Sequence, residues 1–323
     1  MIEKLNYFGK NRIPFLFIID FDKINPLVIP ISEINNGEIL FNIKGFKNYD
    51  FNQKLDKDII LKKYPMSFDN YKIAFDKVNK EFYKGNTFLL NLTFPTKIEL
   101  NLNLREIFFH SVAKYKLFFY DKFVVFSPEC FINIKDDKIY SYPMKGTIDA
   151  TIPDAENIIL NDEKEFAEHI TIVDLIRNDL GIVSQNVRVE KFRYIDKIVT
   201  HNKALLQVSS EIIGDLQANW NENIGDIIYS LLPAGSISGA PKKKTVEIIK
   251  EAENYDRGYY TGIFGFFDGK SLDSAVMIRF IEQIDKNFYF KSGGGITIYS
   301  DVQKEYLELI EKVYVPIIRD NQN

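Results

Sequence analysis

The order of strand-like and helix-like segments constrains the fold of this chain more than any other feature. Short apolar segments of strand character come in two long series, at 15–21, 27–31, 38–43, 88–94, 117–120, 123–126 and 131–134, and at 187–193, 205–213, 261–267, 274–282 and 288–291. Amphipathic helices are expected at 71–83, 162–180, 224–231, 241–253 and 303–315. Because the helices do not alternate regularly with the strands, the pattern favours an α+β fold with mostly antiparallel sheets.

Local signals predict where some of these segments begin and end. Asn36-Gly37, between two strand-like segments, predicts a hairpin turn, and Gly181 is expected to end the helix before it. Charged residues lead to Pro65 and indicate a seam in the chain. We therefore expect residues 1–62 to be a short strand-rich segment packed on the core of a larger domain, residues 63–323.

Composition excludes several classes of protein. Lysine plus arginine is 41 and aspartate plus glutamate is 45, a net charge of −4 that argues against a general nucleic-acid binder. The single cysteine, Cys130, excludes a disulfide framework and a cysteine-based zinc site. No apolar run approaches the roughly 20 residues that span a bilayer, and no signal-peptide cleavage pattern is present. We expect a soluble cytoplasmic protein with no nucleic-acid or membrane partner.

Two pairs of glutamates stand three residues apart on expected helices. Glu165 and Glu168 form the first pair, and Glu305 and Glu308 form the second. Residues at this spacing share a helix face, so each pair presents two carboxylates in one direction. If the two helices face each other, four carboxylates form an oxygen site suited to Mg²⁺. The alternative is that both pairs are solvated, and His169 is expected to be a hydrogen-bonded structural residue.

Two further segments indicate anion binding. Lys291-Ser-Gly-Gly-Gly295 follows a strand directly, and its glycines can adopt positive φ and bring backbone N–H groups close to an anion. The alternative is a flexible turn. Lys242, Lys243 and Lys244 follow Pro241 at the start of a helix capped by Ser238 or Gly239, where the helix dipole disfavours cations. Either an anion such as a carboxylate binds there, or the lysines point into water.

Glu129 and Lys145 form a possible acid and nucleophile pair. Glu129 lies in Ser-Pro-Glu at 127–129 and Lys145 in Pro-Met-Lys-Gly-Thr at 143–147. A desolvated lysine is a nucleophile because burial lowers its pKa, and a nearby glutamate can transfer the proton. Taken alone, these two residues are better explained as ordinary surface charges.

Taken together, these motifs resemble the chorismate-utilising enzymes, over about residues 65–320. This family contains anthranilate synthase component I, aminodeoxychorismate synthase component I, isochorismate synthase and salicylate synthase. The resemblance rests on the motifs around Glu129 and Lys145 and on blocks in the order of the family, at 168–181, 235–242, 257–262, 278–279, 293–296 and 305–308. Within the family it is strongest for aminodeoxychorismate synthase component I in a short form, because that branch has lysine at position 145 where anthranilate-forming members have alanine.

The resemblance implies a fold, a reaction and a set of site residues. The fold is a four-layer α/β/β/α arrangement around two mostly antiparallel sheets. The reaction converts chorismate and ammonia to 4-amino-4-deoxychorismate, in the p-aminobenzoate branch of folate synthesis. Lys145 would form a covalent intermediate and Glu129 would protonate the departing 4-hydroxyl. Glu168 and Glu308 would bind Mg²⁺, assisted by Glu165 and Glu305, and the implied substrate-binding residues are Thr147, Ser238, Tyr260, Arg279, Gly293, Gly294, Gly295 and Lys312.

Several alternatives remain open at this point. The first is a different chorismate enzyme, either anthranilate synthase component I or an isochorismate or salicylate synthase. The second is a non-catalytic anion-binding protein with the same fold, which would predict loss of the acidic residues and of Lys145. Many family members have histidine where this chain has Gln207, so an acid–base role is not transferred to that position. The chain has no glutaminase motif around Cys130, so ammonia is expected from a separate glutamine amidotransferase subunit.

Overall fold

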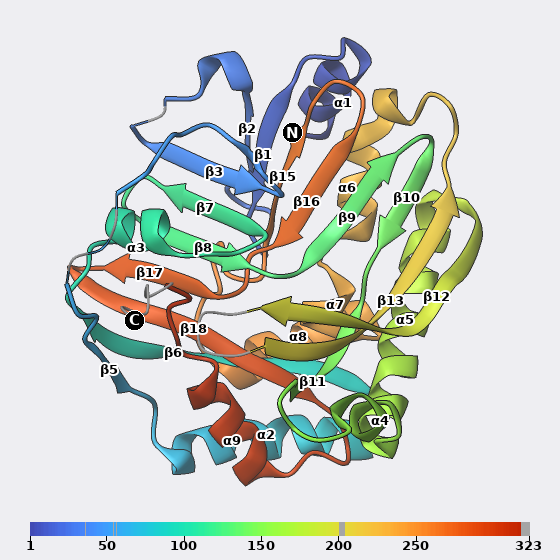
Figure 1. Ribbon diagram of the computed structural model, residues 1–323. Helices are drawn as coiled ribbons and strands as arrows, with labels where there is room; N and C mark the ends of the chain where they lie inside the picture. Colours follow the sequence, from blue (N-terminus) through green and yellow to red (C-terminus); the bar gives the residue numbers. More distant parts are fainter. Residues whose placement is uncertain (36, 54, 56, 200–203, 318–323) are drawn as a thin grey trace.

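The computed structural model describes residues 1–317 except residues 36, 54, 56 and 200–203. Two antiparallel sheets form its centre (Figure 1). In spatial order, sheet A contains β11 (Met144–Asp149), β13 (Ala204–Asp215), β10 (Lys138–Ser141), β9 (Cys130–Lys135), β16 (Leu272–Val276), β15 (Ile263–Phe267), β1 (Phe15–Ile19) and β2 (Leu27–Pro30), with β12 (Gln185–Val199) paired to β13. Sheet B contains β14 (Gly239–Ala240), β6 (Leu89–Leu100), β18 (Asn287–Ile296), β17 (Phe280–Ile284), β8 (Phe123–Ser127), β7 (Tyr115–Phe119), β3 (Ile39–Ile43) and β4 (Phe46–Lys47), with β5 (Leu61–Tyr64) paired to β6.

Helices cover the outer face of each sheet. Sheet A is covered by α1 (Ile2–Lys10), α5 (Glu163–Val183) and α6 (Ile224–Leu231). Sheet B is covered by α2 (Phe68–Tyr83), α3 (Leu104–His110), α8 (Lys242–Glu253) and α9 (Val302–Glu311). Two short helices, α4 (Ala155–Leu160) and α7 (Gly235–Ser238), contact β11 and the α5–α8 region respectively. The predicted α+β fold with four layers, α/β/β/α, is confirmed.

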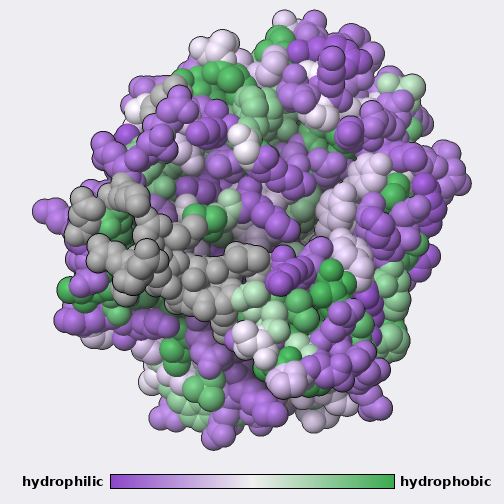
Figure 2. Space-filling view, in the orientation of Figure 1, coloured by the Kyte–Doolittle hydropathy of each residue, from purple (hydrophilic) through white to green (hydrophobic). Residues whose placement is uncertain are grey.

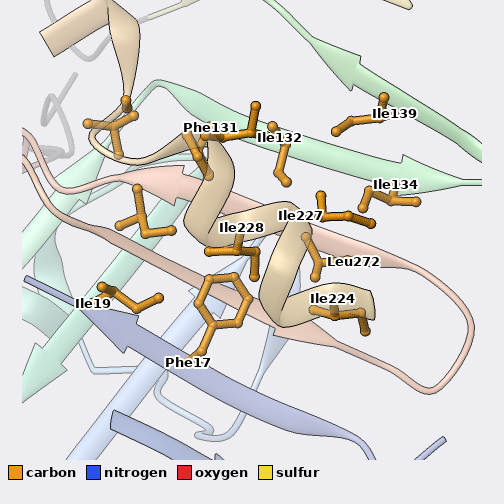
Figure 3. Packing of buried hydrophobic residues seen from close by; sticks show 14 of the residues in the cluster. Phe17, Ile19, Phe131, Ile132, Ile134, Ile139, Ile224, Ile227, Ile228 and Leu272 are labelled. Atoms are coloured by element: carbon orange, nitrogen blue, oxygen red, sulfur yellow. The ribbon is translucent and has the colours of Figure 1, made fainter. Parts of the chain in front are cut away.

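The apolar strand β1 illustrates why the layers form. All five of its residues are buried. Phe15, Phe17 and Ile19 face the helices, whereas Leu16 and Ile18 face the other sheet. A strand covered on both faces needs apolar residues at every position and not an alternating pattern. Figure 3 shows the helix side of this packing, where α6 lies on the strands of sheet A. Its side chains Ile224, Ile227 and Ile228 pack against strand side chains, which include Phe17, Ile19, Ile132, Ile134 and Leu272.

Residues 1–62 contribute strands to both sheets. β1 and β2 lie at one end of sheet A, β3 and β4 lie at one end of sheet B, and β5 spans the expected boundary between residues 62 and 63. That boundary stays a prediction. On the face shown in Figure 2, polar side chains predominate and apolar ones lie in small groups between them. Within the described part of the chain, no helix has both the length and the apolar character needed to cross a membrane.

Three expectations about element boundaries are wrong. The hairpin at Asn36-Gly37 does not form, because β2 pairs with β1 in sheet A whereas β3 pairs with β7 and β4 in sheet B; Asn36 itself lies outside the described residues. Gly181 does not end α5: it is exposed with open space beside it, so the helix continues to Val183 at the cost of about 1 kcal/mol for glycine. Residues 274–282 form two strands in different sheets, separated at Arg279, which has φ +53°.

Candidate active site

Glu129 lies where the chain passes from β8 in sheet B to β9 in sheet A. Ser236, on α7, donates its hydroxyl to Glu129 Oε1. Burial raises the pKa of the Glu129 carboxyl, although the hydrogen bond from Ser236 and three nearby cations, Lys145, Lys312 and Arg279, favour the charged form. A glutamic acid in these surroundings keeps its proton to a higher pH than an exposed one, which suits a general acid.

Lys145 lies on β11, and its ammonium donates to Glu168 Oε2 of α5 at 3.0 Å. The Lys145 side chain is 25% exposed and that of Glu168 is 13% exposed. Burial disfavours the charge on Lys145, but the attraction of Glu168, Glu165 and Glu308 outweighs it, so the pKa of Lys145 is raised. The expectation that burial keeps this amine neutral is therefore wrong, because the neighbouring carboxylates keep it protonated.

The glutamates of α9 face the glycine-rich part of β18. A β-carbon on Gly294 would lie 3.1 Å from Glu308 Oε1 and 3.4 Å from Glu305 Oε2, so the absence of a side chain lets both carboxylates approach the sheet. Lys312, one turn after Glu308, binds Glu308 Oε1 at 2.5 Å and donates to the Gly293 carbonyl at 2.8 Å. Burial lowers the pKa of Lys312, and the attraction of Glu308 opposes this shift.

Glycines also admit the groups that α5 and β11 contribute. A β-carbon on Gly295 would lie 3.3 Å from Lys145 Nζ, and one on Gly146 would lie 3.2 Å from Glu165 Oε2. The expected glycine loop at 291–295 is wrong, because these residues continue β18 and pair with β6, without positive φ. Close approach of neighbouring groups, and not an unusual backbone conformation, explains why glycine occurs here.

The four glutamates were tested as a possible Mg²⁺ site by their donor chemistry and their surroundings. Among the residues that the structure describes, no three His, Cys, Asp or Glu side chains lie close enough together to hold a metal. Glu168 and Glu308 instead bind Lys145 and Lys312. The ammonium of Lys145 is nevertheless attracted by carboxylates of both α5 and α9, so a cation already occupies the space between the two helices. The four glutamates supply the negative charge and the oxygen donors that a divalent cation prefers, but the described side chains do not converge on one metal position, so the Mg²⁺ site stays a prediction.

Arg279 and Tyr260 adjoin the same group of charges. Arg279 Nη1 donates to the Lys312 carbonyl at 3.4 Å, and its guanidinium lies 5.0 Å from the ring centre of Tyr314. Its Nε is buried and has no hydrogen-bond partner in the described part of the chain. Tyr260 is buried, with its ring 5.8 Å from that of Phe280. A buried N–H donor with no partner, next to Lys312, suits a carboxylate ligand.

Thr147 and Ser238 make no contact with this group of charges in the described part of the chain. Thr147 is exposed on β11 and pairs with Gln207 of β13. Ser238 is fully buried, and its hydroxyl donates to the Ala234 carbonyl at 2.8 Å. The substrate-binding roles of Thr147 and Ser238 therefore stay predictions. His169, by contrast, is a buried structural residue as expected, with Nε2 at 2.7 Å from Ser210 Oγ.

The lysines at the start of α8 are explained by the chain itself. Lys242 binds Asp179 Oδ1 at 2.8 Å and the Leu231 carbonyl at 2.9 Å, and Lys244 binds Glu247 at 3.0 Å. A carboxylate does lie near Lys242, as expected, but it belongs to α5. The expected cap was wrong, because Pro241 is the N-cap of α8.

Sequence reasoning missed two supporting interactions. Ser236 was part of a recognised motif, but its contact with Glu129 depends on the tertiary fold. Arg257 and Glu253, four residues apart, form a buried ion pair at 2.5 Å. Arg257 also donates to the carbonyl groups of Ile237 on α7 and Asn91 on β6, and so it ties together segments next to Glu129 and Gly295. Arg257 lies beyond the end of α8 at Glu253, so no helical spacing in the sequence predicts this pair.

The chain is similar to several known proteins. The model of the chorismate binding enzyme family matches residues 38–317. A PabA-like protein of Haemophilus influenzae is 56% identical over 98% of this chain and 96% of its own length. Aminodeoxychorismate synthase component 1 of Bacillus subtilis is 32% identical over 77% of this chain and 55% of its own length.

Solved structures show the same architecture. Anthranilate synthase component I of Streptococcus pneumoniae superposes with a TM-score of 0.67 at 26% identity, over 79% of this chain and 59% of that one. The menaquinone-specific isochorismate synthase of Escherichia coli superposes with a TM-score of 0.74 at 14% identity, over 96% of this chain and 79% of that one. At that identity the second likeness concerns the fold alone.

Proposed function

The chain belongs to the chorismate binding enzyme family, and from this premise we propose that it is the ammonia-using component of an aminodeoxychorismate synthase. The observation that carries the proposal is the position of Lys145, paired with Glu168 and within electrostatic reach of Glu129. A lysine at this position is what the resemblance associates with amination at C4. The 32% identity to aminodeoxychorismate synthase component 1 over 77% of the chain supports the same choice.

In the proposed mechanism Lys145 acts as a nucleophile and Glu129 as the acid. Lys145 first releases one ammonium proton to solvent, and its neutral Nζ attacks C2 of chorismate. Both ring double bonds shift, the C4–O bond breaks, and the Glu129 carboxyl gives its proton to the departing oxygen, which leaves as water. Ammonia then adds at C4, both double bonds shift back, and the C2–N bond to Lys145 breaks. The product is 4-amino-4-deoxychorismate.

Other residues hold the substrate in this proposal. The unpartnered Nε of Arg279 and the ammonium of Lys312 suit the substrate carboxylates, with Tyr260 and the Gly293–Gly295 backbone beside them. Mg²⁺ bound by Glu168 and Glu308, with Glu165 and Glu305 assisting, would neutralise the ring carboxylate. Its binding would compete with Lys145 and Lys312 for the carboxylates that these lysines now contact.

The second candidate is anthranilate synthase component I. An enzyme of that name from Aquifex aeolicus is 35% identical over 58% of this chain. Against it stands Lys145, where the resemblance gives anthranilate-forming members alanine. Identification of the product distinguishes the two candidates. The purified chain is incubated with chorismate, MgCl₂ and ammonium chloride, and the products are separated by chromatography and identified by mass spectrometry. We expect 4-amino-4-deoxychorismate; anthranilate or isochorismate as the main product would overturn the proposal.

A further inference from the structure

A small cavity lies beside Glu129, on a side that Lys145 does not line. Its volume is about 20 Å³, room for about one molecule the size of water or ammonia. Most of its wall is apolar, from Phe131 and Ile132 of β9 (Figure 3) and from side chains of α5 and α6. The side chains with polar groups in its lining are Glu129, Cys130, Ser141, Tyr142, Asp179 and Ser236. A cavity with an apolar wall and a few polar groups suits one small neutral molecule.

Two carboxyl groups are held on either side of the first turn of α7. Ser236 donates to Glu129 Oε1 on one side. On the other side, Asp179 Oδ1 binds Lys242 at 2.8 Å, and Asp179 Oδ2 lies 2.8 Å from the point where a β-carbon on Gly235 would be. The glycine therefore leaves Asp179 Oδ2 next to the cavity. Asp179 is 8% exposed, so its carboxylate is not a surface group.

We propose that this cavity is a binding site for ammonia, in which Asp179 and Glu129 accept hydrogen bonds from its N–H groups. This inference rests on the proposed function. In that reaction Glu129 protonates the 4-hydroxyl, so it must lie beside C4, the same carbon to which nitrogen adds. A molecule in the cavity therefore contacts the carboxyl group that acts at C4 in this reaction. Ion-paired Asp179 accepts hydrogen bonds, which ammonia supplies through three N–H groups.

Ammonia bound beside Glu129 also explains how Glu129 regains its proton at the end of the reaction. When ammonia adds at C4, the electron pair of the C2–N bond returns to Lys145, which leaves as a neutral amine. The new C4 substituent is then an ammonium group with one proton more than the product amine. Glu129, left as a carboxylate after protonating the departing oxygen, accepts that proton and is again an acid. Each turnover consumes one chorismate and one ammonia and releases one 4-amino-4-deoxychorismate and one water.

The test separates ammonia binding from the steps before it. Asp179→Asn removes the charged acceptor, and Ala234→Val adds two methyl groups to the cavity wall and so reduces its volume. For both variants we expect the KM for ammonia, measured with ammonium chloride at one fixed pH, to rise about tenfold, the effect of losing a hydrogen bond to a charged group. The KM for chorismate, and the amount of Lys145 adduct formed from chorismate without ammonia, should stay within about twofold of the parent.

Asp174→Asn is the matched control, since Asp174 is an exposed residue of α5 that pairs with Arg177, and it should leave all three quantities unchanged. A thermal melt establishes that each variant is folded. A folded Ala234→Val with the parental KM for ammonia would mean that only water occupies the cavity, and would overturn the inference. So would an equal loss of adduct formation, which would indicate a structural role. If the parent protein forms no aminated product at all, the proposed function itself fails.

Discussion

At the scale of single residues, the state of Lys145 decides what the site can do. Its carboxylate neighbours raise the pKa of Lys145. The fraction of Lys145 in the neutral, nucleophilic form is therefore small near neutral pH and increases as the pH rises. We expect incubation with chorismate and Mg²⁺, without ammonia, to leave a mass adduct on the peptide that contains Lys145. Lys145→Met should abolish the adduct and lower amination at least about 10²-fold, the loss typical of a positioned catalytic group. Peptide mass spectrometry and the amination rate measure both.

Lys145→Arg separates nucleophilicity from charge. Guanidinium stays protonated, so this variant keeps the positive charge beside Glu168 but cannot attack carbon. It should fail as completely as Lys145→Met. If it retained the parental rate, Lys145 would be a partner for a carboxylate and the covalent mechanism would be wrong.

His169 supplies a residue-scale prediction about stability. Burial lowers the pKa of His169 to about 4, with Arg193 and Lys145 adding to the shift. The unfolded chain binds a proton at this histidine below about pH 6.5, whereas the folded chain does not until about pH 4, so stability falls as the pH drops through that window. Urea unfolding at pH 7, 6 and 5 should show this loss, which reaches at most about 3 kcal/mol at lower pH. His169→Gln should lose less stability over the same range; an identical pH dependence would contradict the assignment.

At the scale of elements, α5 and α9 bring the acidic residues of the site together. Each helix contributes carboxylates that approach glycines of β11 and β18, and each is also bound to a lysine. If both helices hold Mg²⁺, Glu168→Gln and Glu308→Gln should each weaken Mg²⁺ binding, measured by calorimetry, by about tenfold or more because a charged oxygen ligand is lost. Turnover should then require more Mg²⁺.

The matched controls lie on the same two helices. Glu163→Gln on α5 and Glu311→Gln on α9 each remove a charge from an exposed position. Both should keep the parental Mg²⁺ affinity. Loss of affinity in these variants equal to that of Glu168→Gln would indicate a general charge effect, and full activity in excess chelator would show that no metal is required.

The elements also show which features could be predicted from sequence. The helix spacing of Glu165 and Glu168, and of Glu305 and Glu308, predicted their shared faces because that relation is local. The strand containing Gly293–Gly295 was missed because glycine is uncommon in strands. Glycine is needed here because Glu308 and Lys145, from distant segments, approach the strand closely. The long-range pairs, such as Lys242 with Asp179, have no local signal at all.

At the scale of the whole molecule, each sheet supplies part of the site. Glu129 lies at the crossing between the sheets, Lys145 belongs to sheet A, and Gly293–Gly295 belong to sheet B. The layer order was predicted from the family resemblance, and strands such as β1, which are apolar at every position and so must be covered on both faces, agree with it. The assignment of neighbouring strands β2 and β3 to different sheets was not, because the turn signal between them carries no information on tertiary pairing.

The last prediction concerns the source of nitrogen for the whole chain. Its single cysteine, Cys130, lies at the start of β9, and burial raises its pKa to about 12, so it carries little of the thiolate that a glutaminase nucleophile needs. The purified chain should therefore aminate chorismate with ammonium salts, faster as the pH rises and more free ammonia exists, and should form no aminated product from glutamine. Adding a glutamine amidotransferase subunit should restore use of glutamine. Cys130→Ser is the control: if it removed glutamine-dependent product from an otherwise competent preparation, the chain would carry its own glutaminase and the two-subunit proposal would be wrong.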